Sequence, residues 1–206
     1  MCIRDSPNIG EEERKKYLEI IHNKTKSLSQ MINHFFEYSR YEISDVQPHF
    51  ENISIDVFAQ NLHETYESIC PDKEICFEII QEENLPPLFG DYMMLYRVFQ
   101  NLIDNSLKFT PQGGIVKIVF NGSSANQIQV QIQDTGRGIH PEQLDSIFNK
   151  FQMAKTTVSN HESNQGLGLG LAIVKKILSL HNSEIFVKSQ PGKGTTFTFF
   201  LPIKGE

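Results

Sequence analysis

The sequence predicts an α/β fold: a two-layer sandwich in which helices cover one face of a mixed β-sheet, preceded by one long α-helix. Three observations support it. Apolar residues recur at alternating spacings of three and four over residues 11–42. Beyond residue 48, strand-like alternation and helical spacing follow each other along the chain. The 206 residues, 39% of them hydrophobic and 21% charged, suffice for one packed domain of about 150 residues and a short appendage.

Residues 11–42 are expected to form the long helix. Its first residues, Glu11, Glu12 and Glu13, suit the positive end of a helix. The residues that follow at heptad spacing are Leu18, Ile21, Thr25, Leu28, Ile32, Phe35 and Ser39. Such a seam packs against partner helices, the alternative being an amphipathic helix that lies on its own domain. Because one helix cannot bury the seam alone, we expect a homodimer through a helix bundle.

The segment from Ser44 to Pro48 breaks the helix and forms a linker. Beyond it, the expected strands cover residues 49–55, 74–80, 115–120, 128–133, 184–188 and 196–201. The expected helices cover 56–69, with Asp56 as cap, 91–109, 141–148 and 169–180. The apolar side of the 91–109 helix consists of Leu95, Val98, Phe99, Leu102 and Ile103. Residues 152–165 are polar and without periodicity, which predicts a mobile lid.

Composition narrows the possible functions. The formal net charge of −6 argues against a nucleic-acid surface. No run of about 18 apolar residues occurs, so membrane anchoring is expected only through a missing upstream region. The cysteines form no CxxC pair, which favours a cytoplasmic domain. Residues 1–6 resemble a translated transposon adaptor from sequencing libraries and are excluded from the fold. A natural start with a short tail is the alternative.

The first polar motif, residues 101–110, places Asn101, Asn105 and Lys108 on one helical face, at spacings of four and three. Amides together with an ammonium group can hold a hydrated Mg²⁺ and phosphate oxygens. Taken alone, such a strip is more often a solvated helix face.

The second motif, residues 134–139, directly follows an expected strand. Asp134 at the strand end can accept a hydrogen bond from an exocyclic amine. Gly136 and Gly138 allow the backbone to approach a flat base. Many ordinary turns share this pattern.

Two glycine-rich motifs come later in the chain. Gly166, Gly168 and Gly170 open a helix, and their backbone amides are free to face a phosphate. This motif lacks the Lys-Ser/Thr of a P-loop and does not follow a strand as a Rossmann fingerprint does. Residues 192–197 form a further glycine-rich turn, for which an ordinary hairpin is the alternative.

Together, in this order and spacing, the four motifs resemble the asparagine box and the glycine boxes of the histidine kinase, gyrase, chaperone and mismatch-repair ATPase superfamily. Residues 148–151 resemble the phenylalanine box of sensor histidine kinases in particular. The resemblance covers residues 48–203 and implies a Bergerat-type fold. It makes 48–206 an ATP-binding catalytic domain, and 7–44 the second helix of the dimerisation and phosphoacceptor domain.

The resemblance also implies roles for individual residues. Asn105 ligates Mg²⁺, Asn101 supports it, Lys108 contacts phosphate, and Asp134 takes the adenine amine. Gly136, Gly138 and Ile139 belong to the base pocket, Phe109 flanks adenine, and Thr196 reaches it through water. Gly166, Leu167, Gly168, Leu169, Gly170 and Leu171 serve the phosphates and the lid, and Lys150 reaches the γ-phosphate. Ser106 replaces a common alanine, and Gln165 a frequent glycine.

The implied activity is that of an ATP-dependent protein histidine kinase in a two-component phosphorelay, with a response regulator receiver domain as partner. The acceptor histidine of the family precedes an acidic residue and an Arg-Thr/Asn-Pro turn, and no such segment occurs. Neither His22 nor His34 is therefore expected to be the acceptor. We expect ATP–Mg²⁺ binding without self-phosphorylation.

Other classes were weighed against this one. A chaperone or topoisomerase ATPase module would carry a glutamate base at position 101 and long additional domains. A degenerate ATP sensor would have lost groups that Asn105, Lys108 and Asp134 retain. A serine kinase of the anti-sigma type would lack the bundle helix.

Overall fold

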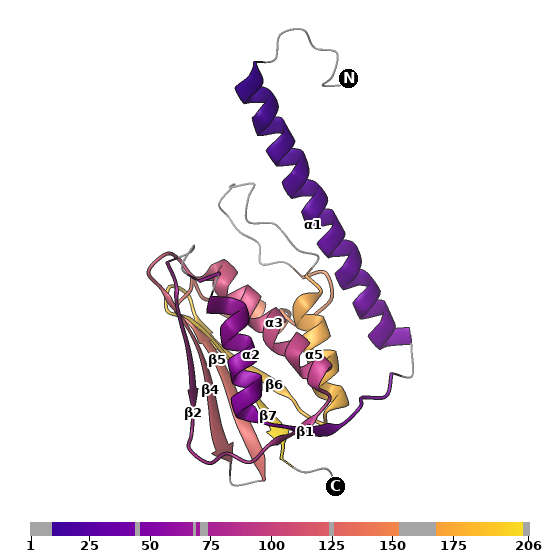
Figure 1. The fold of residues 1–206 in the computed structure, drawn as a ribbon, viewed down its shortest axis with the longest axis vertical. Helices are drawn as coiled ribbons and strands as arrows, with labels where there is room; N and C mark the ends of the chain where they lie inside the picture. The colour runs from indigo at the N-terminus through magenta and orange to yellow at the C-terminus, as the bar shows by residue number, and fades with distance from the viewer. Residues whose placement is uncertain are drawn as a thin grey trace.

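The computed structural model describes residues 10–43, 46–67, 69–70, 74–123, 126–152 and 168–203. The helices are α1 Glu11–Ile43, α2 Ile55–Glu67, α3 Tyr92–Phe109, α4 Pro141–Leu144 and α5 Gly170–Leu180. The strands are β1 Glu51–Ile53, β2 Cys76–Gln81, β3 Leu88–Gly90, β4 Ile115–Ser123, β5 Gln127–Asp134, β6 Ile185–Gln190 and β7 Gly194–Pro202. Most of α1 projects away from the remaining elements (Figure 1).

The main sheet of the described chain has the strand order β2-β4-β5-β7-β6. Strands β2 and β4 run parallel, and the other neighbours are antiparallel. Strands β1 and β3 form a small antiparallel pair in which Ile53 lies opposite Leu88. Helices α2, α3 and α5 cover one face of the sheet (Figure 1). The predicted α/β sandwich, preceded by one long helix, is therefore confirmed.

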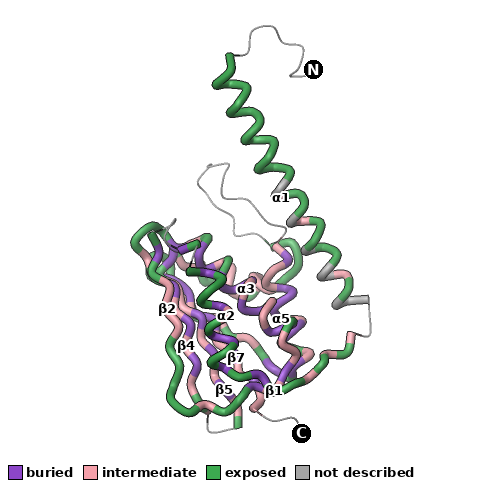
Figure 2. The backbone as a smooth tube through the Cα atoms, viewed as in Figure 1, coloured by how far each residue is buried: buried purple, intermediate pink, exposed green. Residues whose placement is uncertain are grey.

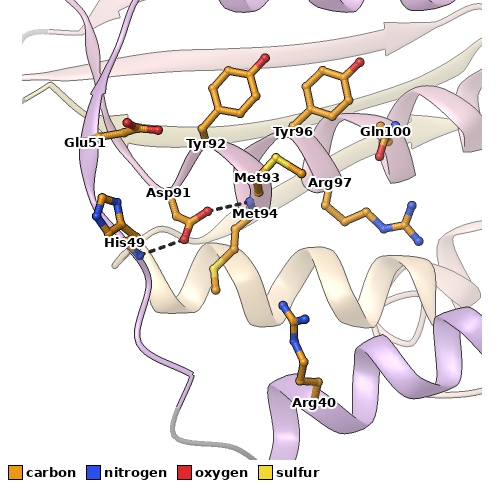
Figure 3. Close-up of a pocket in the computed structure, with 10 residues that line it drawn as sticks. All are labelled: Arg40, His49, Glu51, Asp91, Tyr92, Met93, Met94, Tyr96, Arg97 and Gln100. Carbon is orange, nitrogen blue, oxygen red and sulfur yellow. Dashed lines mark hydrogen bonds between the residues drawn. The ribbon is translucent and has the colours of Figure 1, made fainter.

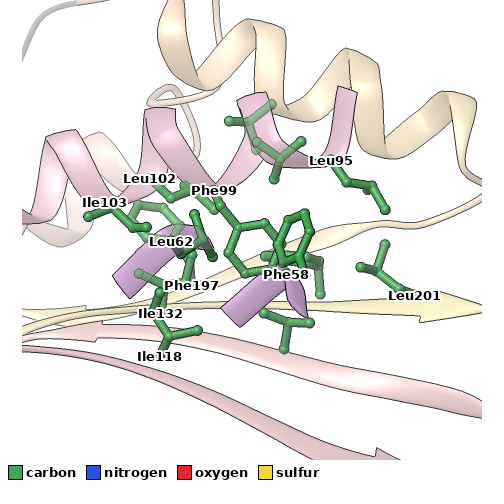
Figure 4. Packing of buried hydrophobic residues seen from close by; sticks show 14 of the residues in the cluster. Phe58, Leu62, Leu95, Phe99, Leu102, Ile103, Ile118, Ile132, Phe197 and Leu201 are labelled. Atoms are coloured by element: carbon green, nitrogen blue, oxygen red, sulfur yellow. The ribbon is translucent and has the colours of Figure 1, made fainter. Parts of the chain in front are cut away.

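The core lies between the helices and the sheet, where the buried residues gather in Figure 2. The predicted apolar side of α3 is fully buried there, at Leu95, Val98, Phe99, Leu102 and Ile103. Phe99 contributes most, because its ring centroid lies 4.9 Å from that of Phe58 and 5.7 Å from those of Phe120 and Phe199. Figure 4 shows Phe58 and Phe99 between α3 and the strands. This packing fixes the angle at which α3 crosses the end of β5.

Several predicted boundaries were wrong. The expected strand 49–55 is confined to Glu51–Ile53, and α2 begins at Ile55, so Asp56 lies in its first turn and does not cap it. Strand β3 was not predicted, because three residues after a Pro-Pro pair are too few to show alternation. The expected helix 141–148 ends as a helix at Leu144 and continues as turns.

The heptad seam of α1 is uncovered in this single chain. Leu18 is 59% exposed and Leu28 57%, and Ile21, Ile32 and Phe35 are exposed as well. Figure 2 shows the exposed class along most of the helix. Within the described residues, helix α1 packs mainly against α5. In the described residues no helix combines the length and apolar character needed to cross a bilayer.

His181 joins three segments of the domain. Its Nε2 accepts a hydrogen bond from the Asp91 backbone N–H (3.0 Å), and its Nδ1 lies 2.8 Å from the Ile177 carbonyl oxygen. Asp91 in turn caps α3 by accepting from the Met94 N–H (3.0 Å), and it accepts from the N–H of His49 in the linker (2.9 Å). His181 therefore holds the end of α5, the start of α3 and the linker together.

The His181 imidazole predicts a pH dependence of stability. Burial lowers the pKa of His181, although the bond to the Ile177 carbonyl and the charge of Asp91 oppose this shift. The unfolded chain, with a pKa of about 6.5, therefore binds a proton more readily, so stability falls as pH drops below that value. In urea unfolding, we expect the native protein to lose more stability than His181→Gln between pH 7.5 and 5. Equal losses would contradict this account of His181.

Candidate functional site

Helix α3 brings the predicted amides to the N-terminus of α5. Asn101 is buried, and its Nδ2 donates to the Arg97 carbonyl (2.9 Å). Its Oδ1 faces Gly170, where an added Cβ would lie only 2.9 Å away. Asn105, one turn later, is half-buried, and Lys108 is exposed at its end of the helix. Of these three residues, Asn101 is the one in contact with the start of α5.

Asp134, the last residue of β5, is held by three neighbours. Its Oδ1 accepts from the N–H groups of Gly136 (2.8 Å) and Thr195 (3.2 Å), and its Oδ2 accepts from the Ser106 hydroxyl (3.4 Å). Burial raises the pKa of Asp134, while these three bonds act in the opposite direction. The result is a partly buried carboxylate of fixed orientation, suited to accept a hydrogen bond from a ligand's amine.

The loop after β5 packs tightly against its neighbours. A Cβ at Gly136 would lie 2.6 Å from the Phe109 carbonyl oxygen. Gly138 has a φ of +69°, and a Cβ there would collide with the Gln190 backbone. The Ile139 N–H donates to the Ser189 hydroxyl (2.9 Å). Both glycines are therefore needed for the loop to approach α3 on one side and β6 on the other.

Phe109, at the end of α3, is flanked by two cations. The Lys108 ammonium lies 5.3 Å from the centroid of its ring, and the Arg137 guanidinium carbon 4.3 Å. Partial desolvation lowers the pKa of Lys108, and the nearby Arg137 charge lowers it further. Positive charge is thus concentrated beside the ring that the resemblance places next to adenine.

The start of α5 has the features of an anion site. Gly168 has a φ of +66°, and a Cβ there would lie 2.5 Å from the Gln152 carbonyl oxygen. Leu169 is fully buried at the N-cap position and offers no side-chain hydrogen bond to the first turn. Gly170 and Leu171 therefore begin a helix whose first N–H groups no cap side chain occupies. Gly166 and Leu167 lie outside the described residues, as does the predicted lid apart from Gln152.

Two further predicted residues are Thr196 and Lys150. Thr196 alternates with buried neighbours on β7 and pairs with Gln133, whereas Thr195 pairs with Asp134 and donates to it. Thr195, not Thr196, is the threonine beside the carboxylate. Lys150 is exposed after α4. Its neighbour Phe148 packs edge-on against Phe197, with ring centroids 6.3 Å apart.

A hollow of about 450 Å³ lies elsewhere, where α1, the linker and the start of α3 meet. Figure 3 shows Arg40 from α1 and Arg97 from α3 beside it, with Asp91 and His49 at the other side. None of its lining residues belongs to the predicted site. The hollow therefore does not mark the place where the four motifs converge.

Comparison with known proteins identifies the family of the chain. Residues 90–205 match the model of the histidine kinase-, DNA gyrase B- and HSP90-like ATPase family. An uncharacterised sensor-like histidine kinase of Pyropia yezoensis, ycf26, is 34% identical over 208 residues, which cover 95% of this chain and 31% of that protein. The chain thus spans about a third of this relative.

Solved structures show the same fold. Full-length ShkA in complex with AMPPNP superposes with a TM-score of 0.78 at 22% identity, over 95% of this chain and 40% of that one. Histidine kinase ThkA in complex with response regulator TrrA gives 0.76 at 22% identity, over 95% and 53%. Because the family model covers more than half of the sequence, the chain belongs to the histidine kinase-, DNA gyrase B- and HSP90-like ATPase family.

Proposed function

We propose that the chain binds ATP with Mg²⁺ and donates the γ-phosphoryl group to a histidine that lies outside the sequence given, as the catalytic domain of a sensor histidine kinase. The observation that carries the proposal is the convergence on Asp134. Its carboxylate lies at the junction of α3, the loop after β5 and the start of β7. Three of the four motifs thus contribute to one partly buried acceptor.

The base would be recognised at Asp134. A fixed carboxylate accepts from the exocyclic amine of adenine and disfavours guanine, which presents a carbonyl oxygen at that position. Gly136 and Gly138 support this assignment, because they let the loop backbone lie close to the pocket. Phe109 and Ile139 would supply apolar contacts to the base.

The phosphates would lie between α3 and the start of α5. Lys108 supplies a positive charge, and the N–H groups of Gly168 and Leu169, just before α5, and of Gly170 and Leu171, in its first turn, supply donors. By the same resemblance, Gly166, Leu167 and Lys150 would add contacts to the phosphates. Phosphoryl transfer depends mainly on such positioning and charge neutralisation, which the chain can provide without a nucleophile of its own.

Magnesium would be held by Asn105 together with the nucleotide. The amide oxygen of Asn105 is a suitable hard ligand, and Asn101 lies one turn away on the same helix. The described residues contain no group of three or more His, Cys, Asp or Glu that would bind a metal unaided. The amides of Asn105 and Asn101 therefore suit an ion that the phosphate oxygens of the nucleotide also coordinate, and they suit a metal site without nucleotide poorly.

The partners follow from the same assignment. The exposed seam of α1 supports a homodimer through a helix bundle, with residues 7–44 as its second helix and 48–206 as the catalytic domain. A response regulator receiver domain would take the phosphoryl group from the acceptor histidine, and ThkA was solved in complex with such a regulator. The exposed thiol of Cys76 suits a cytoplasmic, reducing location.

Calorimetric titration and radiolabelling test this function together. We expect the chain to bind ATP saturably, and more tightly when Mg²⁺ is present, while Mg²⁺ alone gives no heat of binding. With ATP labelled at the γ-phosphate, we expect no acid-labile label on the chain, because neither His22 nor His34 has the surroundings of an acceptor. Failure to bind ATP would refute the proposed nucleotide site. Labelling of the chain would refute the claim that it contains no phosphoacceptor histidine.

A further inference from the structure

We propose that Arg137 is a second cation for the phosphate groups of the nucleotide, acting beside Lys108. The inference rests on the proposed function and adds a residue to it: Arg137 stands between the two glycines of the second motif. Nothing in the spacing of that motif assigns it a role. Its backbone and its guanidinium supply two separate lines of support.

The backbone of Arg137 is fixed where three motifs meet. Its N–H donates to the Phe109 carbonyl at the end of α3 (3.1 Å). Its carbonyl accepts from the Gly192 N–H in the turn between β6 and β7 (2.8 Å). The side chain therefore starts from a defined point on the rim of the site, although the residue itself is exposed.

The guanidinium lies over the Phe109 ring. Its central carbon lies 4.3 Å from the centroid of Phe109, within the range of a cation–π contact. Since it occupies one face of that ring, a purine beside Phe109 must use the other face or the edge. Nucleotide and guanidinium would then be immediate neighbours.

The Lys108 ammonium and the Arg137 guanidinium both lie near the Phe109 ring, and no described carboxylate is paired with Arg137. The Lys108 ammonium lies 5.3 Å from the same centroid, close enough for the Arg137 charge to lower the pKa of Lys108. Within the described residues, no carboxylate lies at ion-pairing distance from the Arg137 guanidinium. Like charges held together are unfavourable, and an anion between them removes the repulsion. A triphosphate is such an anion, and the planar guanidinium can bind its oxygens with two hydrogen bonds.

The test compares nucleotides with and without phosphates on the whole chain. Calorimetry would measure ATP and adenosine binding to the native protein, Arg137→Gln, Arg137→Lys and Lys188→Gln. Lys188→Gln is the matched control, because it removes one positive charge at an exposed position of β6. Half-buried and exposed residues alternate along that strand. We expect Arg137→Gln to weaken ATP binding about tenfold, as loss of one charge-assisted contact does, and adenosine binding less than twofold. Arg137→Lys should lie in between, and Lys188→Gln should match the native protein.

Each outcome decides the proposal. Equal losses for ATP and adenosine in Arg137→Gln would show that the residue acts on Phe109 or the base, and unchanged ATP affinity would remove it from the site; either result overturns the proposal. If Lys188→Gln lost as much ATP affinity as Arg137→Gln, the effect would come from net charge alone, and the proposal would be overturned too. Failure of the native chain to bind ATP would instead sink the proposed function as a whole. Adenosine binding by Arg137→Gln doubles as the check that the variant folds.

Discussion

Asp134→Asn is expected to weaken ATP binding by about 100-fold or more while the protein stays folded. The amide oxygen of asparagine can still accept from the N–H groups of Gly136 and Thr195, and its NH₂ group can donate to the Ser106 hydroxyl. What changes is the group that faces the adenine amine. The NH₂ group of asparagine is a hydrogen-bond donor, and so is the adenine amine, so the two cannot pair. A buried polar pair that is left unmatched costs more than the bond it replaces.

Binding titrations of ATP to native and Asp134→Asn protein measure this effect. Asp56→Asn is the matched control, because it removes the same charge from α2, where the side chain accepts a hydrogen bond from Gln81 on β2. The control should bind ATP like the native protein, and both variants should unfold at nearly the native temperature. If Asp134→Asn binds ATP with native affinity, the carboxylate does not recognise the base.

The same carboxylate predicts how ATP binding depends on pH. Burial raises the pKa of Asp134, so its protonation begins at a higher pH than for an ordinary aspartate with a pKa of about 3.9. Because the protonated form no longer accepts at both oxygens, ATP affinity should fall as the pH is lowered toward this raised value. The residual binding of Asp134→Asn should lack this component.

Regular helical spacing was enough to predict part of the site. Positions four and three apart on α3 place Asn101, Asn105 and Lys108 on one face whatever the tertiary structure. A carboxylate at a strand end and alternating glycines are likewise local features. For that reason the α3 face, Asp134 and the glycine turns could all be derived from the sequence.

Contacts across the sheet could not be derived in this way. Ser106 reaches Asp134 only because α3 packs over the end of β5, a contact between residues 28 positions apart. Thr195 and Thr196 are adjacent in sequence, and only the pairing of Asp134 with Thr195 decides which one lies beside the carboxylate. Arg137 is placed by bonds to the end of α3 and to the turn between β6 and β7. These positions depend on register and packing, which local periodicity does not determine.

Gly138→Ala is expected to have the largest effect on stability. Gly138 has a φ of +69°, which is strained for alanine, and its new Cβ would collide with the backbone of Gln190, which cannot rotate away.

Gly113→Ala is the matched control, because its φ of +77° is similar but a Cβ there would meet nothing within 4 Å. The control should lose about 1 kcal/mol from strain alone. Gly138→Ala should lose about 3 kcal/mol or more, which lowers the melting temperature by roughly 6–12 °C in a chain of this length. Because the displaced loop carries the Gly136 N–H that orients Asp134, ATP binding should fall with stability in this variant and remain native in Gly113→Ala. Thermal unfolding of both variants, followed by ATP titration below the transition, measures the two effects separately. Equal destabilisation of the two variants would mean that the loop after β5 does not approach β6 as closely as the argument requires.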